Sequence, residues 1–260
     1  MLISRVPLYQ QAYIELRRRI AAGEFAPGAR VDVQTVADEL EISRTPVREA
    51  IRQLLQEGLL ESSRDGRVSV FNPNAEQLAE IYLARAAFEA TSVAVALKSR
   101  LPIDTREIEA AVRRARRAVE SDDWQSIVEA NSFLHEWLMG LSESEFIRRV
   151  MGTTQIYVTR YRGLSMQFPH RQADAQHAHE EILELIRSRD ESVSDRIYDH
   201  VALAGGWAIQ SLKPDPEGDT PSMACLRAIW SERKESEAAN DSTTMEAGNA
   251  AGPLTETPAN

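Results

Sequence analysis

The stretch at residues 43–55 constrains the fold of this chain more than any other part of its sequence. It reads Ser-Arg-Thr-Pro-Val-Arg-Glu-Ala-Ile-Arg-Gln-Leu-Leu, and its apolar residues recur at the three- and four-residue spacing of a helix. Ser43 suits the N-cap position of that helix. The pattern predicts a short helix that rests one face on a core. Four polar residues then lie at its exposed N-terminal end: Ser43, Arg44, Thr45 and Arg48.

A second short helix is expected just upstream, over residues 35–40, with the tight link Glu41-Ile42 between the two. Two short helices joined in this way, the second beginning with Arg and Thr, are typical of a helix-turn-helix that reads bases in the DNA major groove. The alternative is an ordinary surface helix whose arginines are only solvated.

The segments on either side complete a winged helix. Residues 7–22 have the apolar spacing of a helix, with Gly23 as its C-cap. Two short strands, residues 59–62 and 68–71, flank a hairpin signal that contains Arg64, Gly66 and Arg67. We therefore expect a winged helix-turn-helix DNA-binding domain over residues 1–71, with these three hairpin residues against the DNA backbone or minor groove.

The net charge of −10 does not exclude a DNA partner, because the acidity lies elsewhere in the chain. Residues 1–70 hold 10 basic and 10 acidic residues, so the remaining 20 basic and 30 acidic residues give the whole excess. Phosphate binding depends on the local field, and several arginines gather around residues 43–55.

Residues 7–71 resemble the winged helix of the GntR family of transcriptional regulators. The Ser-Arg-Thr-Pro-Val-Arg-Glu-Ala core carries the resemblance, together with Pro27-Gly28 and the Glu57-Gly58-Leu59 that follows the second helix. The family implies that Arg44, Thr45 and Arg48 contact DNA, with Ser43 near a phosphate. One departure is Glu41, which stands where the family usually has glycine, so this turn lacks glycine's freedom at positive φ.

After a linker at residues 72–76 the chain has only helical patterns. Asn74 followed by Gln77 resembles a capping box. Six helices are expected: 75–98, 104–120, 122–141, 144–165, 171–188 and 191–211. The fold class is thus mainly α, an N-terminal winged helix followed by an all-α bundle of six to seven helices over residues 77–212. The tail at 213–260 is expected to be disordered, apart from one helical pattern at residues 223–230.

Several polar residues fall on the apolar stripes of these helices. His135, His179 and His200 lie on three different stripes, and Asn131 precedes His135 by one turn. A lone histidine on such a stripe is more often a core residue, but three imidazoles with one oxygen donor suit a divalent transition metal. We expect zinc, with nickel or manganese as alternatives. Arg85 also points inward, and the helix phase can bring Tyr157 and Arg160 inward as well.

Residues 77–212 resemble the FCD ligand-binding domain, which follows the GntR winged helix in one large subfamily. The resemblance implies that His135, His179 and His200 hold a metal together with an aspartate, which here is replaced by Asn131. It also implies that an arginine in an Arg-x-x-x-Glu pattern, here Arg85 and Glu89, binds a carboxylate effector.

Two classes of function follow from these patterns. The first is a DNA-binding regulator, more often a repressor, that works as a homodimer on a short inverted repeat and responds to a small organic acid. The second is a metal-dependent enzyme in the bundle, but the sequence has no nucleophile motif or phosphate-binding loop. The single cysteine, Cys225, fits a reducing cytoplasm, and no apolar run predicts a membrane span.

Overall fold

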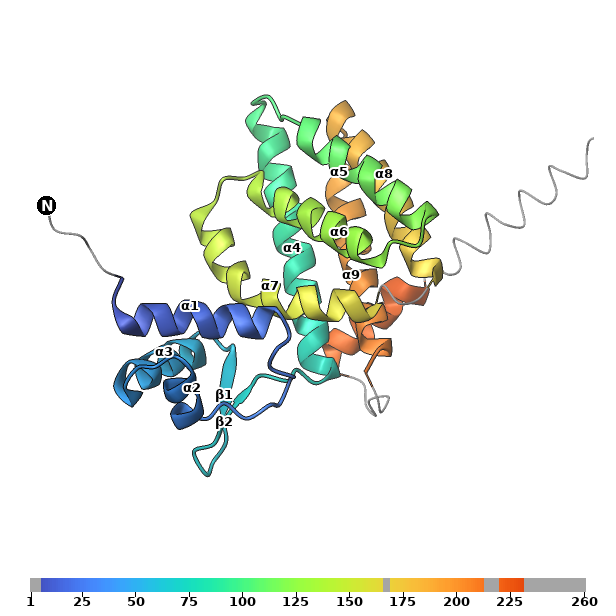
Figure 1. The fold of residues 1–260 in the computed structure, drawn as a ribbon. Helices are drawn as coiled ribbons and strands as arrows, with labels where there is room; N and C mark the ends of the chain where they lie inside the picture. The colour runs from blue at the N-terminus through green and yellow to red at the C-terminus, as the bar shows by residue number, and fades with distance from the viewer. Residues whose placement is uncertain (1–5, 166–168, 213–219, 232–260) are drawn as a thin grey trace, which may run out of the picture.

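The computed structural model describes residues 6–165, 169–212 and 220–231. Its N-terminal part is a winged helix-turn-helix, as the sequence predicted (Figure 1). Strands β1 and β2 pair antiparallel, with Leu60 opposite Val70. The elements of this part are α1 (Leu8–Ala21), α2 (Val33–Glu39), α3 (Arg44–Gln56), β1 (Leu60–Ser62) and β2 (Val68–Val70).

The second part is an all-α bundle, and its helices lie where apolar spacing predicted them. They are α4 (Ala75–Ser99), α5 (Arg106–Glu120), α6 (Trp124–Gly140), α7 (Glu145–Ser165), α8 (Pro169–Ser188) and α9 (Val193–Gln210). The capping box of α4 is present: the Gln77 amide donates to Asn74 Oδ1 at 2.8 Å, and the Asn74 amide donates to Gln77 Oε1 at 3.0 Å.

Helix α4 runs through the middle of the bundle, and its most extensive contact is with α9 (Figure 1). The two backbones approach closely at Gly205, where an added Cβ would lie 2.7 Å from Tyr82 Cβ. Only glycine fits so short a separation. The tight pair α4–α9 forms the frame on which Arg85 and His200 are held.

Helix α7 connects the bundle to the winged helix (Figure 1). Arg17 of α1 donates to the Gly152 carbonyl of α7 at 3.0 Å, and Phe71 after β2 packs edge-on against Tyr157 of α7. The main buried apolar cluster therefore runs without a break from the winged helix into the bundle. The winged helix and the bundle, which the sequence predicted as two successive domains, thus share one buried cluster.

A further helix at residues 221–231 lies inside the predicted disordered tail, where the sequence showed its one helical pattern. Met223 and Leu226 are buried, and Trp230 packs edge-on against Trp207 of α9 with ring centroids 4.8 Å apart. The predicted disorder at residues 213–219 and 232–260 lies outside the described residues. No helix in the described part of the chain is long and apolar enough to cross a membrane.

Candidate functional site

The DNA-reading residues that the sequence predicted share one exposed end of α3. Arg44, Thr45 and Arg48 are all exposed, while Val47 and Ile51 on the opposite side are buried in the core. Ser43 occupies the N-cap position, but its side chain makes no capping hydrogen bond. Its hydroxyl is thus available at the helix N-terminus, where backbone N–H groups favour an anion such as phosphate.

The turn before α3 adopts the conformation that its sequence disfavours. Glu41 has φ of +54°, in the left-handed region where glycine is favoured. The turn is therefore built as in a glycine-containing helix-turn-helix, with backbone strain at Glu41.

The hairpin residues Arg64, Gly66 and Arg67 form the exposed tip of the wing. Gly66 has φ of +78°, and its amide donates to the Ser63 carbonyl at 2.9 Å, which closes the turn. Arg67 Nε lies 2.9 Å from Asp65 Oδ2 in an exposed ion pair that a phosphate can replace at little cost.

The three histidines come together in the bundle interior. His135 of α6, His179 of α8 and His200 of α9 are at most 3% exposed, and one ligand atom of each lies within 4.8 Å of the others. The Nε2 atoms of His179 and His200 are 3.0 Å apart. Ligands of one ion at about 2.1 Å each have a similar separation.

The surroundings of His200 favour the neutral imidazole that metal ligation requires. Burial lowers the pKa of His200 well below its usual value, and the charges of His179, Arg171 and other nearby groups lower it further. His200 is therefore neutral at neutral pH. His135 Nδ1 contacts Glu89 Oε2 at 2.7 Å, and because a carboxylate only accepts hydrogen bonds, Nδ1 carries the proton. In the neutral form of His135, Nε2 is then the nitrogen with a lone pair for a metal.

Glu89 also links the histidines to Arg85. Arg85 Nε lies 2.6 Å from Glu89 Oε1, and both side chains are at most 1% exposed. This contact is an ion pair without hydrogen-bond geometry, and Arg85 Nη2 is buried without a hydrogen-bond partner among the described residues. Arg85 is thus partly neutralised by Glu89 and still has a donor to offer. Sequence reasoning placed Glu89 only as part of a pattern and missed its role as the partner of His135.

Asn131 supports the fit of a metal to this site. It is 3% exposed, lies one turn before His135 on α6, and its Oδ1 is buried with no hydrogen-bond partner among the described residues. A buried carbonyl oxygen without a donor is costly. Three neutral imidazoles and this oxygen make a donor set that suits a divalent transition metal.

Tyr157, which the sequence predicted to bind the effector, is buried and directs its hydroxyl toward the winged helix. Its hydroxyl donates a hydrogen bond to the Gly58 carbonyl, just after α3. Burial raises the pKa of Tyr157, so the hydroxyl stays protonated and remains a donor. The helix phase correctly predicted a buried side chain but not which part of the protein buries it. Arg160 belongs to α7, and its side chain lies outside the described part of the structure.

Arg171 in the first turn of α8 is a buried residue that sequence reasoning missed. It is 4% exposed, and among the residues that the structure describes its Nε has no hydrogen-bond partner and its guanidinium forms no ion pair with a carboxylate. Burial lowers its pKa to about 10. The spacing of Arg171, Ala175 and His179 would have revealed it, because it extends the apolar stripe of this helix back by one turn.

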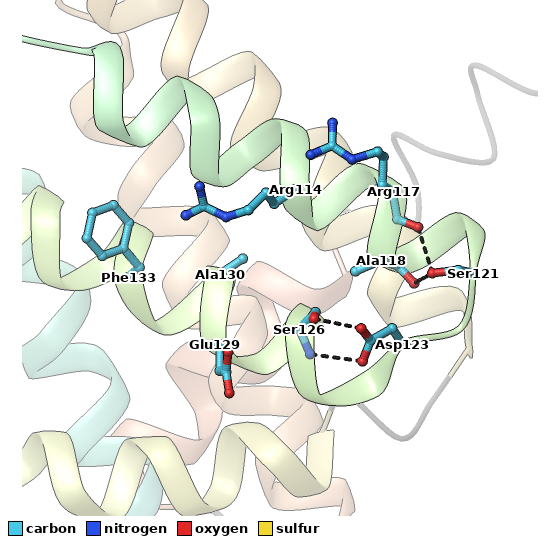
Figure 2. Close-up of a pocket in the computed structure, with 9 residues that line it drawn as sticks. All are labelled: Arg114, Arg117, Ala118, Ser121, Asp123, Ser126, Glu129, Ala130 and Phe133. Carbon is cyan, nitrogen blue, oxygen red and sulfur yellow. Dashed lines mark hydrogen bonds between the residues drawn. The ribbon is translucent and has the colours of Figure 1, made fainter.

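A surface hollow of about 540 Å³ lies between α5 and α6, apart from the histidines (Figure 2). Arg114 and Arg117 of α5 line it on one side, and Glu129 and Phe133 of α6 line it on the other. These four side chains are all exposed, so the hollow holds its charged groups in water. The buried histidine and arginine cluster is therefore the better candidate for a ligand site.

Comparison with known proteins agrees with both halves of this arrangement. Residues 8–70 match the model of the bacterial regulatory proteins of the gntR family, and residues 80–202 match the FCD domain. The chain is 25% identical over 192 residues to YdhC, an uncharacterised HTH-type transcriptional regulator of Bacillus subtilis, covering 72% of this chain and 84% of the relative.

This chain is also similar to a second relative and to a solved structure. The gluconate operon transcriptional repressor of Bacillus subtilis is 24% identical over 153 residues, 59% of this chain and 63% of the relative. A putative GntR transcriptional regulator from Rhodococcus sp. RHA1 shares the fold with a TM-score of 0.65 at 22% identity, over 79% of this chain and 99% of that structure. These matches are to transcriptional regulators rather than enzymes, and the chain belongs to the GntR family, in the group whose winged helix-turn-helix is followed by an FCD domain.

Proposed function

We propose that this regulator is a repressor, and that a small carboxylate bound among Arg85 and the three histidines releases it from its operator. The observation that carries the proposal is the convergence of three buried imidazoles in the bundle that also buries Arg85. One of the relatives is a repressor of the gluconate operon, which supports repression rather than activation.

We place a zinc ion on His135, His179 and His200, with Asn131 as the oxygen donor and with nickel or manganese as alternatives. When bound, the ion supplies positive charge and open positions for a carboxylate oxygen. Arg85 orients the acid through its Nη2, while Glu89 fixes the tautomer of His135 and so keeps its Nε2 directed at the site. Arg160 remains a candidate for the same pocket. The exclusion of water by the buried surroundings strengthens each of these contacts.

On the DNA side, Arg44, Thr45 and Arg48 would read base edges, with Ser43 on a phosphate. Arg64, Gly66 and Arg67 of the wing would contact the backbone or minor groove. A single short recognition helix contacts too few bases for operator affinity, so a homodimer on a short inverted repeat is the expected working unit.

Thermal stabilisation across a panel of small organic acids, with Zn²⁺ and with chelator, tests the effector site directly. We expect at least one acid to stabilise the metal-loaded protein and to release it from its own upstream DNA in a gel shift. If no acid does so in either metal state, while the protein still binds DNA, the proposed effector site is wrong.

A further inference from the structure

We infer that Arg171 is a second anion-binding residue of the effector site, and that the effector therefore carries two acidic groups. The inference rests on the proposed function, because it assigns a second contact to the acid that Arg85 and the histidines would hold. It concerns a residue outside the predicted metal and effector set.

Arg171 lies in a position that is unfavourable for a cation in three ways. It is 4% exposed, so its charge has lost most of its hydration. Within the described part of the chain, its Nε has no hydrogen-bond partner and no carboxylate forms an ion pair with it. It also lies in the first turn of α8, where the helix dipole repels positive charge. A buried, unpaired charge is among the most costly features of a folded protein. An anionic ligand would relieve this cost.

The same residue belongs to the histidine and arginine cluster. Arg171 and His179 are two helical turns apart with the buried Ala175 between them, so the three share one face of α8. Arg171 and Arg85 each act electrostatically on His200, and Arg85 acts on Arg171. Two buried guanidinium groups, one on α4 and one on α8, thus lie in the same bundle interior as the imidazoles.

The balance of charge in this interior indicates the charge of the ligand. Glu89 offsets Arg85, whereas the groups that favour the charged form of Arg171 are Tyr82 and the exposed Asp174. No carboxylate in the described part of the chain pairs with Arg171, so its positive charge has no direct partner there even before a metal is bound. One carboxylate would satisfy the metal and Arg85 and would leave Arg171 without an anion. A dicarboxylate, or an acid that also carries a phosphate, would place one acidic group at the metal and Arg85 and the other at Arg171.

The test compares acids that differ by one charge at equal size. The full-length protein is loaded with Zn²⁺ and titrated with succinate and its monoamide, and with glutarate and its monoamide, by calorimetry. We expect at least one dicarboxylate to bind about 10- to 100-fold more tightly than its monoamide, the range for a lost charge-assisted hydrogen bond.

Two variants assign that difference to Arg171. Arg171→Met should reduce the preference to about twofold or less and leave the monoamide affinity unchanged, because the second contact is lost. It should also raise the melting temperature of the acid-free protein, because an unpaired buried charge is replaced by an apolar group of similar volume. Arg187→Gln, at an exposed arginine of the same helix, should change neither quantity.

Three results would overturn the inference while the proposed function stands: equal affinity of the wild-type protein for each diacid and its monoamide, an undiminished preference in Arg171→Met, or an Arg171→Met protein that melts lower or fails to fold. The last result would make Arg171 a structural residue. If neither the diacids nor the monoamides bind, the proposed effector site fails first and this inference falls with it.

Discussion

The hydroxyl of Tyr157 donates a hydrogen bond to the carbonyl oxygen of Gly58, and this single contact joins the helical bundle to the end of the recognition helix α3. The same tyrosine ring packs edge-on against Phe71, which follows β2, with centroids 5.1 Å apart. Helix α7 also packs on α4, α6 and α9, which carry Arg85, His135 and His200. A shift of α7 would therefore reach both the recognition helix and the wing.

Removal of this hydroxyl should uncouple the two parts. Tyr157→Phe leaves the Gly58 carbonyl without its donor, so we expect a loss of about 1–2 kcal/mol in the free energy of unfolding. Acid affinity should be unchanged, while the acid should release DNA less completely. Denaturant unfolding, calorimetry and operator titration with and without acid measure the three quantities.

A matched control is Tyr13→Phe, which removes a hydroxyl that bonds to Glu57 at 2.9 Å within the winged helix itself. It should lower stability but leave the acid's effect on DNA intact. If Tyr157→Phe instead weakens acid binding, Tyr157 belongs to the effector site, as the sequence had suggested.

The sequence predicted the helices and the histidine cluster because both depend on local spacing. His135, His179 and His200 lie on apolar stripes, and any packing that buries those stripes brings the three rings inward. The Asn74 capping box and the Arg64–Arg67 turn were predictable for the same reason, since each depends on residues three or four positions apart.

The contacts between helices were not predictable in this way. The pairing of Glu89 with His135 depends on the relative position of α4 and α6 along their axes. A single sequence does not reveal that position. Tyr157 faces the winged helix, because α7 packs on both the bundle and the winged helix. A helix phase that predicts a buried side chain therefore does not tell which of the two parts buries it. Arg171 lies one turn before Ala175 on the stripe that contains His179, and its burial depends on how the first turn of α8 packs in the bundle.

The strained turn before α3 predicts a stabilising substitution. Glu41 has φ of +54°, so Glu41→Gly should raise the free energy of unfolding by about 1 kcal/mol through relief of left-handed strain. The control Glu49→Gly, inside α3, should lower it by about 1 kcal/mol because glycine disfavours a helix. Urea unfolding distinguishes these opposite signs, and equal losses in both variants would mean that the turn is unstrained.

The close contact of α9 with α4 predicts a destabilising alanine. In Gly205→Ala the new Cβ would lie 2.7 Å from Tyr82 Cβ, close to the backbone of α4 where little can move. We expect a loss of about 1–3 kcal/mol. Gly152→Ala in α7 meets no atom within 4 Å and should stabilise by up to about 1 kcal/mol through helix propensity. Thermal unfolding of both variants checks the pair, and a neutral Gly205→Ala would contradict the tight packing.

The exposed end of α3 should supply the sequence-specific contacts to DNA, and the wing should supply the contacts that do not depend on sequence. Arg44→Ala should weaken operator binding by about 1–3 kcal/mol and reduce discrimination against mismatched sites, as expected for a lost guanine contact. Arg64→Ala at the wing should weaken binding to all sequences alike and reduce its salt dependence. Titrations against operator and scrambled DNA at two salt concentrations separate the effects. Unchanged affinity and selectivity in Arg44→Ala would remove α3 from the recognition role.

The histidine cluster predicts one bound divalent ion per chain. His179→Ala should abolish metal retention, whereas His177→Ala, at an exposed histidine of the same helix, should retain it. Elemental analysis after purification without chelator gives the metal content of each protein. If the wild type neither holds nor takes up an ion, the three histidines are core hydrogen-bonding residues.

Asn131 predicts that metal affinity can be increased at this site. Its buried Oδ1 has no donor among the described residues, and as a neutral amide it offsets none of an ion's charge. Asn131→Asp places a carboxylate at the same position, so the metal should be held more tightly, by about tenfold or more. The added negative charge also lowers the site's attraction for an anion, so the acid that binds the wild type should bind the variant more weakly. Competition with a fluorescent chelator measures the first effect, and calorimetry with the acid measures the second. A variant that holds metal no better than the wild type would place the Asn131 oxygen outside the coordination sphere.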